Sequence, residues 1–334
     1  FPYLTADDVF QPFIIRTAFP VDDRSYFMGN YPNANKNGYS YLLPLKKEIF
    51  KYLSLDTICG KTSGVHATNV FELRDAGTGV EAIIRLPIQK DKYITLRRIY
   101  HEIDEPNVEQ NKGAVVNCTF DLYLYPSDHI VNADNIDKPQ RVYLLDGDWR
   151  NLTKYYDYSV EVFKAEQGIG DNLVYSVIKR EDKSINSLTS KVFVAKNEFD
   201  VIKVSNGFAE GMLIPQYAHV SNGPDAFEFA IDFGTTNTHV EYQVNNGQVT
   251  HPLEMSASNS AVLSLHSFNS YYQELFVNRE IEVFLEAPIQ EFMPVAFGAQ
   301  EMTGFPLRTN ICVSKSNAQN EGQSIRTKIT LGDY

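Results

Sequence analysis

Cysteine is scarce in this 334-residue sequence, and its few positions exclude whole classes of protein. The three residues, Cys59, Cys118 and Cys312, are odd in number and far apart. Disulfide frameworks need paired cysteines, and zinc sites need closely spaced ligands. Metal-ligand spacing is also missing from four scattered histidines, which are His66, His101, His129 and His219. The pattern therefore predicts buried thiols in a reducing, cytoplasmic compartment.

Basic residues and long apolar runs are also in short supply. The 30 Lys and Arg are outnumbered by 42 Asp and Glu, and the net charge of -12 repels the phosphates of nucleic acids and anionic membranes. No apolar run is long enough to cross a bilayer, and Phe1–Phe10 has neither the basic start nor the apolar segment of a leader. We therefore expect no nucleic acid and no membrane as partner. The missing initial Met leaves two alternatives, a removed leader or a piece of a longer protein.

Apolar and aromatic residues, in contrast, are abundant, at 43% and 13% of the sequence. A chain of this length and composition can bury a sizeable core and build two or three domains. From Lys92 to Tyr217, short aromatic and β-branched runs alternate with turn residues, which is typical of an antiparallel sandwich or barrel. The strands expected here are Tyr93–Tyr100, Ala114–Tyr125, Arg141–Leu145, Tyr158–Lys164, Leu173–Ile178, Lys191–Ala195 and Asp200–Val204.

One helix stands out in the first half of the sequence. Ile49, Tyr52 and Leu53 have helical spacing within Leu45–Leu55, which predicts a helix with these side chains in the core. Further along, the turn-rich stretch Ser221–Asp225 marks a domain boundary. The sequence therefore divides into a β-rich domain of residues 1–222 and a second domain of residues 223–334.

The stretch directly after this boundary is the one place where residue types and spacing together suggest chemistry. In Phe227–Phe233 apolar and polar residues alternate with a period of two, which predicts a strand, expected here to be buried. A polar turn follows, and then a second alternating strand that ends at Val244. Asn246–Gly247 suits a two-residue hairpin loop, because both residues tolerate positive φ.

The polar turn contains the groups needed to bind phosphate and a metal ion. Gly234 has no Cβ, so a phosphate can approach its backbone closely. Thr235, Thr236 and Asn237 supply amide and hydroxyl donors to phosphate oxygens. Asp232 supplies a carboxylate of the kind that Mg²⁺ binds together with phosphate and water.

In these residues the stretch Ile231–Thr238 resembles the first phosphate-binding motif of the actin, sugar kinase and heat-shock chaperone ATPase superfamily. The resemblance implies ATP and Mg²⁺ as cofactors, with Asp232 facing the metal and Gly234, Thr235, Thr236 and Asn237 holding the phosphates. It also implies that the motif lies on the first hairpin of a ribonuclease H-like domain. The predicted fold class is therefore mainly β with an α/β part: an antiparallel β-sandwich-like domain followed by a partial ribonuclease H-like domain.

The rest of the superfamily's nucleotide site is missing from this sequence. Asn245–Tyr334 contains neither a second phosphate loop of Asp-x-Gly type nor a glycine-rich adenosine loop. We therefore expect the amino-terminal portion of a chaperone-like or actin-like ATP-binding protein, with ATPase activity only in a longer form and with an unidentified protein partner. The alternative is a β-sandwich module that binds a protein or a glycan through exposed aromatics, without nucleotide activity.

Two other glycine-containing stretches resemble phosphate loops without meeting their requirements. Cys59–Thr62 resembles the end of a P-loop, but Leu55 stands where that motif needs glycine. Asp75–Gly79 resembles the superfamily's second phosphate loop but precedes the first, so a glycine-rich hairpin is the favoured interpretation. Beyond the motif, we expect a helix over Tyr271–Phe292 that is broken at Pro288, and a strand over Phe305–Val313, in which Arg308 has no assigned role.

Overall fold

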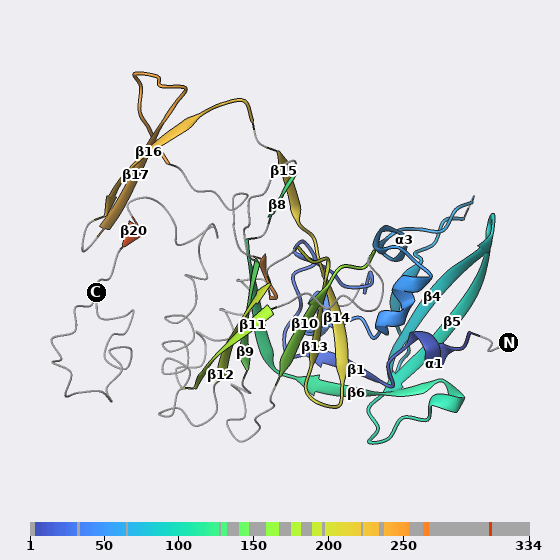
Figure 1. The fold of residues 1–334 in the computed structure, drawn as a ribbon. Coiled ribbons are helices and arrows are strands. Elements are labelled where there is room, and N and C mark those ends of the chain that lie inside the picture. The colour runs from blue at the N-terminus through green and yellow to red at the C-terminus, as the bar shows by residue number, and fades with distance from the viewer. Residues whose placement is uncertain are drawn as a thin grey trace. The chain divides into compact units, whose positions relative to one another are not determined.

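The computed structural model of the protein describes residues 4–31, 34–64, 66–126, 128–131, 140–146, 158–166, 175–181, 189–195, 198–221, 223–233, 237–253, 263–266 and 307–308. These residues are mainly in strands (Figure 1). The chain forms two compact units. Unit 1 comprises Phe1–Tyr125, Asp137–Tyr217 and Ser264–Tyr271, and unit 2 comprises Pro126–Ile136, Ala218–Leu263 and Tyr272–Tyr334.

Helical structure in the described residues is confined to short turns. No helix among them is both long and apolar enough to cross a lipid bilayer. The α-helices are α1 (Ala6–Val9), α2 (Ala34–Asn37) and α3 (Leu55–Cys59), and the 3₁₀ turns are η1 (Lys47–Lys51) and η2 (Val108–Gln110).

The first sheet of unit 1 mixes parallel and antiparallel pairs. Its strand order is β1 (Phe13–Thr17), β6 (Lys112–Cys118), β5 (Lys92–His101), β4 (Gly79–Gln89) and β3 (Phe71–Asp75). β6 runs parallel to both β1 and β5, whereas β3, β4 and β5 form an antiparallel meander. A purely antiparallel arrangement is therefore wrong for this sheet, because long connections return β6 in the direction of its neighbours.

Two further sheets of unit 1 are antiparallel. One has the order β10 (Ser159–Phe163), β13 (Val201–Ser205), β14 (Glu210–Pro215) and β2 (Tyr26–Phe27). The other has the order β11 (Tyr175–Glu181), β12 (Thr189–Ala195), β9 (Gln140–Asp146), β7 (Phe120–Tyr125) and β19 (Leu263–Ser264). Short strands from distant parts of the sequence thus complete both sheets.

Unit 2 contributes two small sheets. β8 (Asp128–Val131) and β15 (Ala218–Ser221) form a parallel pair. The other sheet contains β16 (Phe227–Phe233), β17 (Asn237–Val244) and β18 (His251–Pro252), and β20 (Leu307–Arg308) pairs with the start of β17.

The predicted β-rich character is confirmed, and so are most of the predicted strands. The seven expected runs between Lys92 and Tyr217 all contain strand, and the run Ala114–Tyr125 is two strands, β6 and β7, interrupted at Thr119. The predicted helix Tyr271–Phe292 lies outside the described residues. Of the predicted strand Phe305–Val313, only Leu307–Arg308 is described, as β20.

The predicted helix Leu45–Leu55 is wrong as a single element. The turn η1 ends at Lys51, and Ser54 then has extended backbone (φ -71°, ψ 161°). The Ser54 hydroxyl accepts the amide hydrogen of Thr57 at 3.3 Å, so this residue caps α3 instead of continuing a helix. Ile49 and Leu53 are buried as expected, whereas Tyr52 is 59% exposed. The apolar spacing therefore reflects two separate turns packed on one core.

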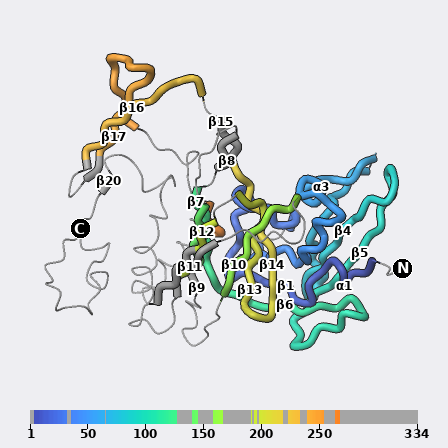
Figure 2. The backbone as a smooth tube through the Cα atoms, in the orientation of Figure 1, coloured from blue at the N-terminus to red at the C-terminus, as the bar shows by residue number. Residues whose placement is uncertain are grey.

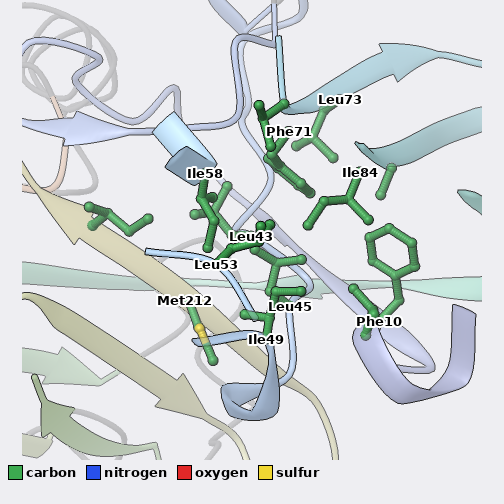
Figure 3. Close-up of a cluster of buried hydrophobic side chains, with 14 of the residues drawn as sticks. Phe10, Leu43, Leu45, Ile49, Leu53, Ile58, Phe71, Leu73, Ile84 and Met212 are labelled. Carbon is green, nitrogen blue, oxygen red and sulfur yellow. The ribbon is translucent and has the colours of Figure 1, made fainter. Parts of the chain in front are cut away.

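This core combines buried side chains of the first hundred residues with others from β10, β13 and β14 (Figure 3). Ile49 and Leu53 belong to the same cluster as the strand residues Phe71 and Ile84 and as Met212 of β14. Each fully buried side chain of this size contributes roughly 1.5–3 kcal/mol through removal of apolar surface from water. β1, the first strand of the chain, also contacts β14, although about two hundred residues separate them in the sequence (Figure 2).

A buried arginine fixes the first segment of the chain onto β5. The Arg98 side chain is 1% exposed and donates to the carbonyl oxygens of Phe10 at 3.0 Å and Gln11 at 3.3 Å. It also forms an ion pair with the Asp7 carboxylate. The Tyr100 hydroxyl donates to the Gln11 carbonyl at 2.8 Å. These contacts hold the link between α1 and β1 in place, because buried carbonyl oxygens need a donor.

We expect Arg98→Ala to lower the free energy of unfolding by about 3 kcal/mol, because it removes the guanidinium that donates to the Phe10 carbonyl oxygen and pairs with the Asp7 carboxylate. Urea denaturation of the full chain measures the effect. The matched control is Arg97→Ala: this neighbouring side chain is 56% exposed and lies 3.5 Å from Glu81, so the change should stay below about 1 kcal/mol. Equal losses for the two variants would refute the role assigned to Arg98.

Both described cysteines are free thiols. The expectation of burial is confirmed for Cys118, where burial raises the pKa of the thiol to about 11. The Asn206 side-chain amide donates to its Sγ at 3.5 Å. Cys59 is only partly buried, although burial, assisted by the charge of Asp56, raises the pKa of its thiol to about 12. Cys312 lies outside the described residues.

The raised pKa values predict unreactive thiols, since the thiolate is the nucleophile. In the native chain at pH 8, we expect iodoacetamide to alkylate Cys59 and Cys118 at least about tenfold more slowly than in the urea-unfolded chain. The rate should climb as the pH approaches the raised pKa values. Mass mapping of peptides reports each cysteine separately. Native rates that match the unfolded ones at pH 8 would contradict this prediction.

Candidate functional site

The predicted strand–turn–strand of the motif is present as an antiparallel hairpin. β16 and β17 pair along their length, from Phe227 opposite Val244 to Phe233 opposite Thr238. The three residues that join them, Gly234 to Thr236, lie outside the described residues. The alternation of apolar and polar residues therefore predicted the pairing of the two strands correctly. Asp232 is the second-to-last residue of β16, directly before Phe233 and the loop.

The opposite end of the hairpin turns at a slightly different position from the predicted one. Asn245 and Asn246, with φ of 53° and 55°, adopt the left-handed conformation that was expected for Asn246 and Gly247. The Gly247 amide donates to the Val244 carbonyl at 2.9 Å. The side-chain oxygen of Asn245 accepts the amide hydrogen of Ala226 at 2.8 Å, which ties the turn to the start of β16. This side-chain bond explains why the turn is one residue earlier.

Asp232, the predicted metal-facing residue, is exposed at the end of β16. Its carboxylate has no hydrogen bond or ion pair with any described residue, and its position in the register is opposite His239. The His239 ring instead pairs with Glu241, with 3.2 Å between Nε2 and Oε1. An exposed carboxylate is the kind of group that binds a hydrated cation.

The expectation that β16 is buried is wrong. Phe227, Phe229 and Ile231 are 54%, 54% and 64% exposed. Their face of the hairpin is held together by aromatic contacts, in which the Tyr242 ring lies 5.9 Å from Phe227, 6.1 Å from Phe229 and 5.6 Å from His251 between centroids. Among the described residues, no second layer of structure packs on this small sheet, so its apolar side chains stay exposed to water.

The predicted phosphate-binding residues are placed only in part. Gly234, Thr235 and Thr236 lie outside the described residues, whereas Asn237 is the first residue of β17. In the register, Asn237 stands opposite Arg308 of β20. The sequence left Arg308 without a role within the predicted strand Phe305–Val313. The fold places it at the same end of the hairpin as Asp232.

The two rejected phosphate-loop candidates are structural turns. Asp75–Gly79 joins β3 to β4, and the Asp75 carboxylate accepts the amide hydrogen of Gly77 at 2.9 Å. A Cβ on Gly79 would lie 1.8 Å from the Tyr100 carbonyl oxygen, so this glycine is needed for close strand packing. Gly60 caps the short helix α3, and Lys61 pairs with Asn69. Both favoured interpretations are confirmed.

Metal-binding groups are sparse in the part of the chain that the structure describes. No cluster of three or more His, Cys, Asp or Glu side chains close enough to hold a metal ion occurs among those residues. Two of the histidines that the sequence left scattered, His129 and His219, stand opposite each other in the β8–β15 register.

Comparison with known proteins adds nothing to these observations, because no family model, curated protein or solved structure matches this chain.

Proposed function

We propose that the loop between β16 and β17 binds the phosphates of Mg-ATP, and that the chain is the amino-terminal portion of a chaperone-like or actin-like ATP-binding protein. The observation that carries the proposal is the position of Asp232, an exposed carboxylate without a described partner at the mouth of the motif loop. Hydrated Mg²⁺ binds through one or two such carboxylates plus phosphate oxygens.

The surrounding architecture is compatible with this role. β16, β17 and β18 form an antiparallel meander, which is the kind of hairpin on which the superfamily motif lies. In the proposed site Asp232 would hold the metal, and Gly234, Thr235, Thr236 and Asn237 would hold the phosphates. Bound Mg²⁺ supplies charge neutralisation of the phosphates. The proposal includes a ribonuclease H-like domain that starts at residue 223, a β-rich domain before it, and a cytoplasmic location.

Charge limits what this portion of the protein does alone. Glu228, Asp232 and Glu241 occupy the polar side of the hairpin, and carboxylates repel ATP unless a cation intervenes. We therefore expect chain 1–334 by itself to bind Mg-ATP weakly, with a Kd above about 1 mM. ATP hydrolysis belongs, in this proposal, to a longer form of the protein with both sides of a nucleotide cleft.

Calorimetric titration of the longest natural form with ATP, in Mg²⁺ and in EDTA, tests the proposal. Asp232→Asn should weaken Mg-ATP binding at least about tenfold and abolish its dependence on Mg²⁺. Glu228→Gln is the matched control, because it removes an exposed carboxylate from the same face of the same strand, four residues away. Its affinity should stay within about twofold of the parent.

The proposal fails if the longest form does not bind Mg-ATP, or if Asp232→Asn and Glu228→Gln bind it equally well. Either outcome would favour the alternative function, a β-rich module that binds a protein or a glycan without nucleotide. One observation favours that alternative: the exposed rings of Phe227 and Phe229 form an apolar surface of the kind found at interaction sites.

A further inference from the structure

A short segment from late in the chain is built into the interior of unit 1. Unit 1 takes in Ser264–Tyr271, although the preceding stretch Ala218–Leu263 belongs to unit 2. Leu265 and His266 are 0% and 3% exposed. Two consecutive buried residues, far along the sequence from the rest of their unit, indicate a specific receiving site.

The backbone of this segment is bound on both sides. The Leu265 amide donates to the Leu122 carbonyl of β7 at 2.8 Å, and the Leu265 carbonyl accepts the amide hydrogen of Asp22 at 2.8 Å. His266 forms an antiparallel bridge with Val21. The segment therefore joins the edge of β7 to Pro20–Asp22, two parts of the chain that are about a hundred residues apart in sequence.

The receiving site is also matched to the histidine side chain. The ring nitrogens of His266 lie 3.1 Å (Nδ1) from the Pro20 carbonyl oxygen and 3.3 Å (Nε2) from the Phe120 carbonyl oxygen. The Phe19 ring contacts the imidazole edge to face, with centroids 5.6 Å apart. Backbone oxygens and an aromatic ring thus surround the imidazole, and an aliphatic side chain here would leave these oxygens without a donor.

A buried carboxylate adds charge complementarity to this match. The Asp121 carboxylate accepts the Leu122 amide hydrogen at 2.8 Å and the Tyr123 hydroxyl hydrogen at 2.5 Å. Burial raises the pKa of Asp121, and electrostatic attraction to His266 acts in the opposite direction. An imidazole on the incoming segment therefore stabilises a carboxylate that the receiving site already contains.

We propose that the edge of β7 and Pro20–Asp22 form a peptide-binding site for an extended Leu-His segment, occupied by the chain's own Leu265–His266. This occupation in cis makes the folding of unit 1 dependent on residues that follow the hairpin of unit 2. Residues 1–222 alone would lack the occupant. The proposal is independent of nucleotide binding, because no residue of the motif loop takes part in it.

Hydrogen exchange of the full chain, followed by mass spectrometry, tests the proposal. In the double variant Leu265→Ala, His266→Ala, we expect exchange in segments 20–27 and 120–125 to be at least about tenfold faster, since the Asp22 amide loses its acceptor and the segment no longer covers the edge of β7 at Leu122. Exchange in β3, β4 and β5 should not change. The matched control is His251→Ala on β18, where the histidine is exposed, and it should leave both segments as protected as in the parent chain.

A synthetic peptide of residues 261–268 then probes the vacated site. Excess peptide should restore protection of both segments in the double variant, and the same peptide with alanine in place of its histidine should not.

If the double variant does not fold, His266→Gln is used in its place, with faster exchange in the same two segments as the expected result. Parent-like exchange in the variants, or no restoration by the peptide, would overturn the proposal. A concentration-dependent dimer of the parent chain would overturn occupation in cis, because a second copy would then supply the segment.

Discussion

The fold of unit 1 depends on one constraint: a β-strand cannot satisfy its own backbone groups or cover its own apolar face. Each buried amide or carbonyl therefore needs a partner from elsewhere in the chain. β14 pairs with the two-residue strand β2, and Leu122 of β7 receives the amide of Leu265. Where no backbone donor is available, a side chain supplies one, as Arg98 does for Phe10 and Gln11. Distant segments are consequently held in place by buried polar contacts as much as by apolar packing.

The hairpin of unit 2 is organised on the opposite principle. β16 and β17 are neighbours in sequence and pair over seven positions, so their pairing needs no distant segment. The side chains of β16 that are described remain exposed, apolar on one face and mainly acidic on the other. An element with this distribution is suited to hold a loop in a defined shape while its surfaces stay available to a ligand or to further protein. The proposed phosphate site makes use of this property at the end where Asp232 lies.

Sequence patterns located elements well wherever the pattern was local. Aromatic and β-branched runs between turn residues predicted β5, β9 and β13, and period-two alternation predicted the β16–β17 hairpin. The patterns failed where neighbours decide the outcome. Helical spacing over Leu45–Leu55 was produced by two turns around a Ser54 cap, and the apolar residues of β16 did not imply burial. A strand was predicted around β20, but its pairing with β17 had no local signal, because the partner of a strand depends on segments far away in the sequence.

By itself, the sequence determined the β-rich character of the protein, the hairpin that carries the motif and the residue types around its loop, because these depend on side-chain alternation and turn chemistry between near neighbours. Only the tertiary structure decided which distant segments meet. It placed Arg98 against the first residues of the chain, and it inserted Leu265 and His266 between β7 and Pro20–Asp22. Such contacts depend on buried groups finding partners across long separations in sequence, and no local pattern of residues encodes that choice.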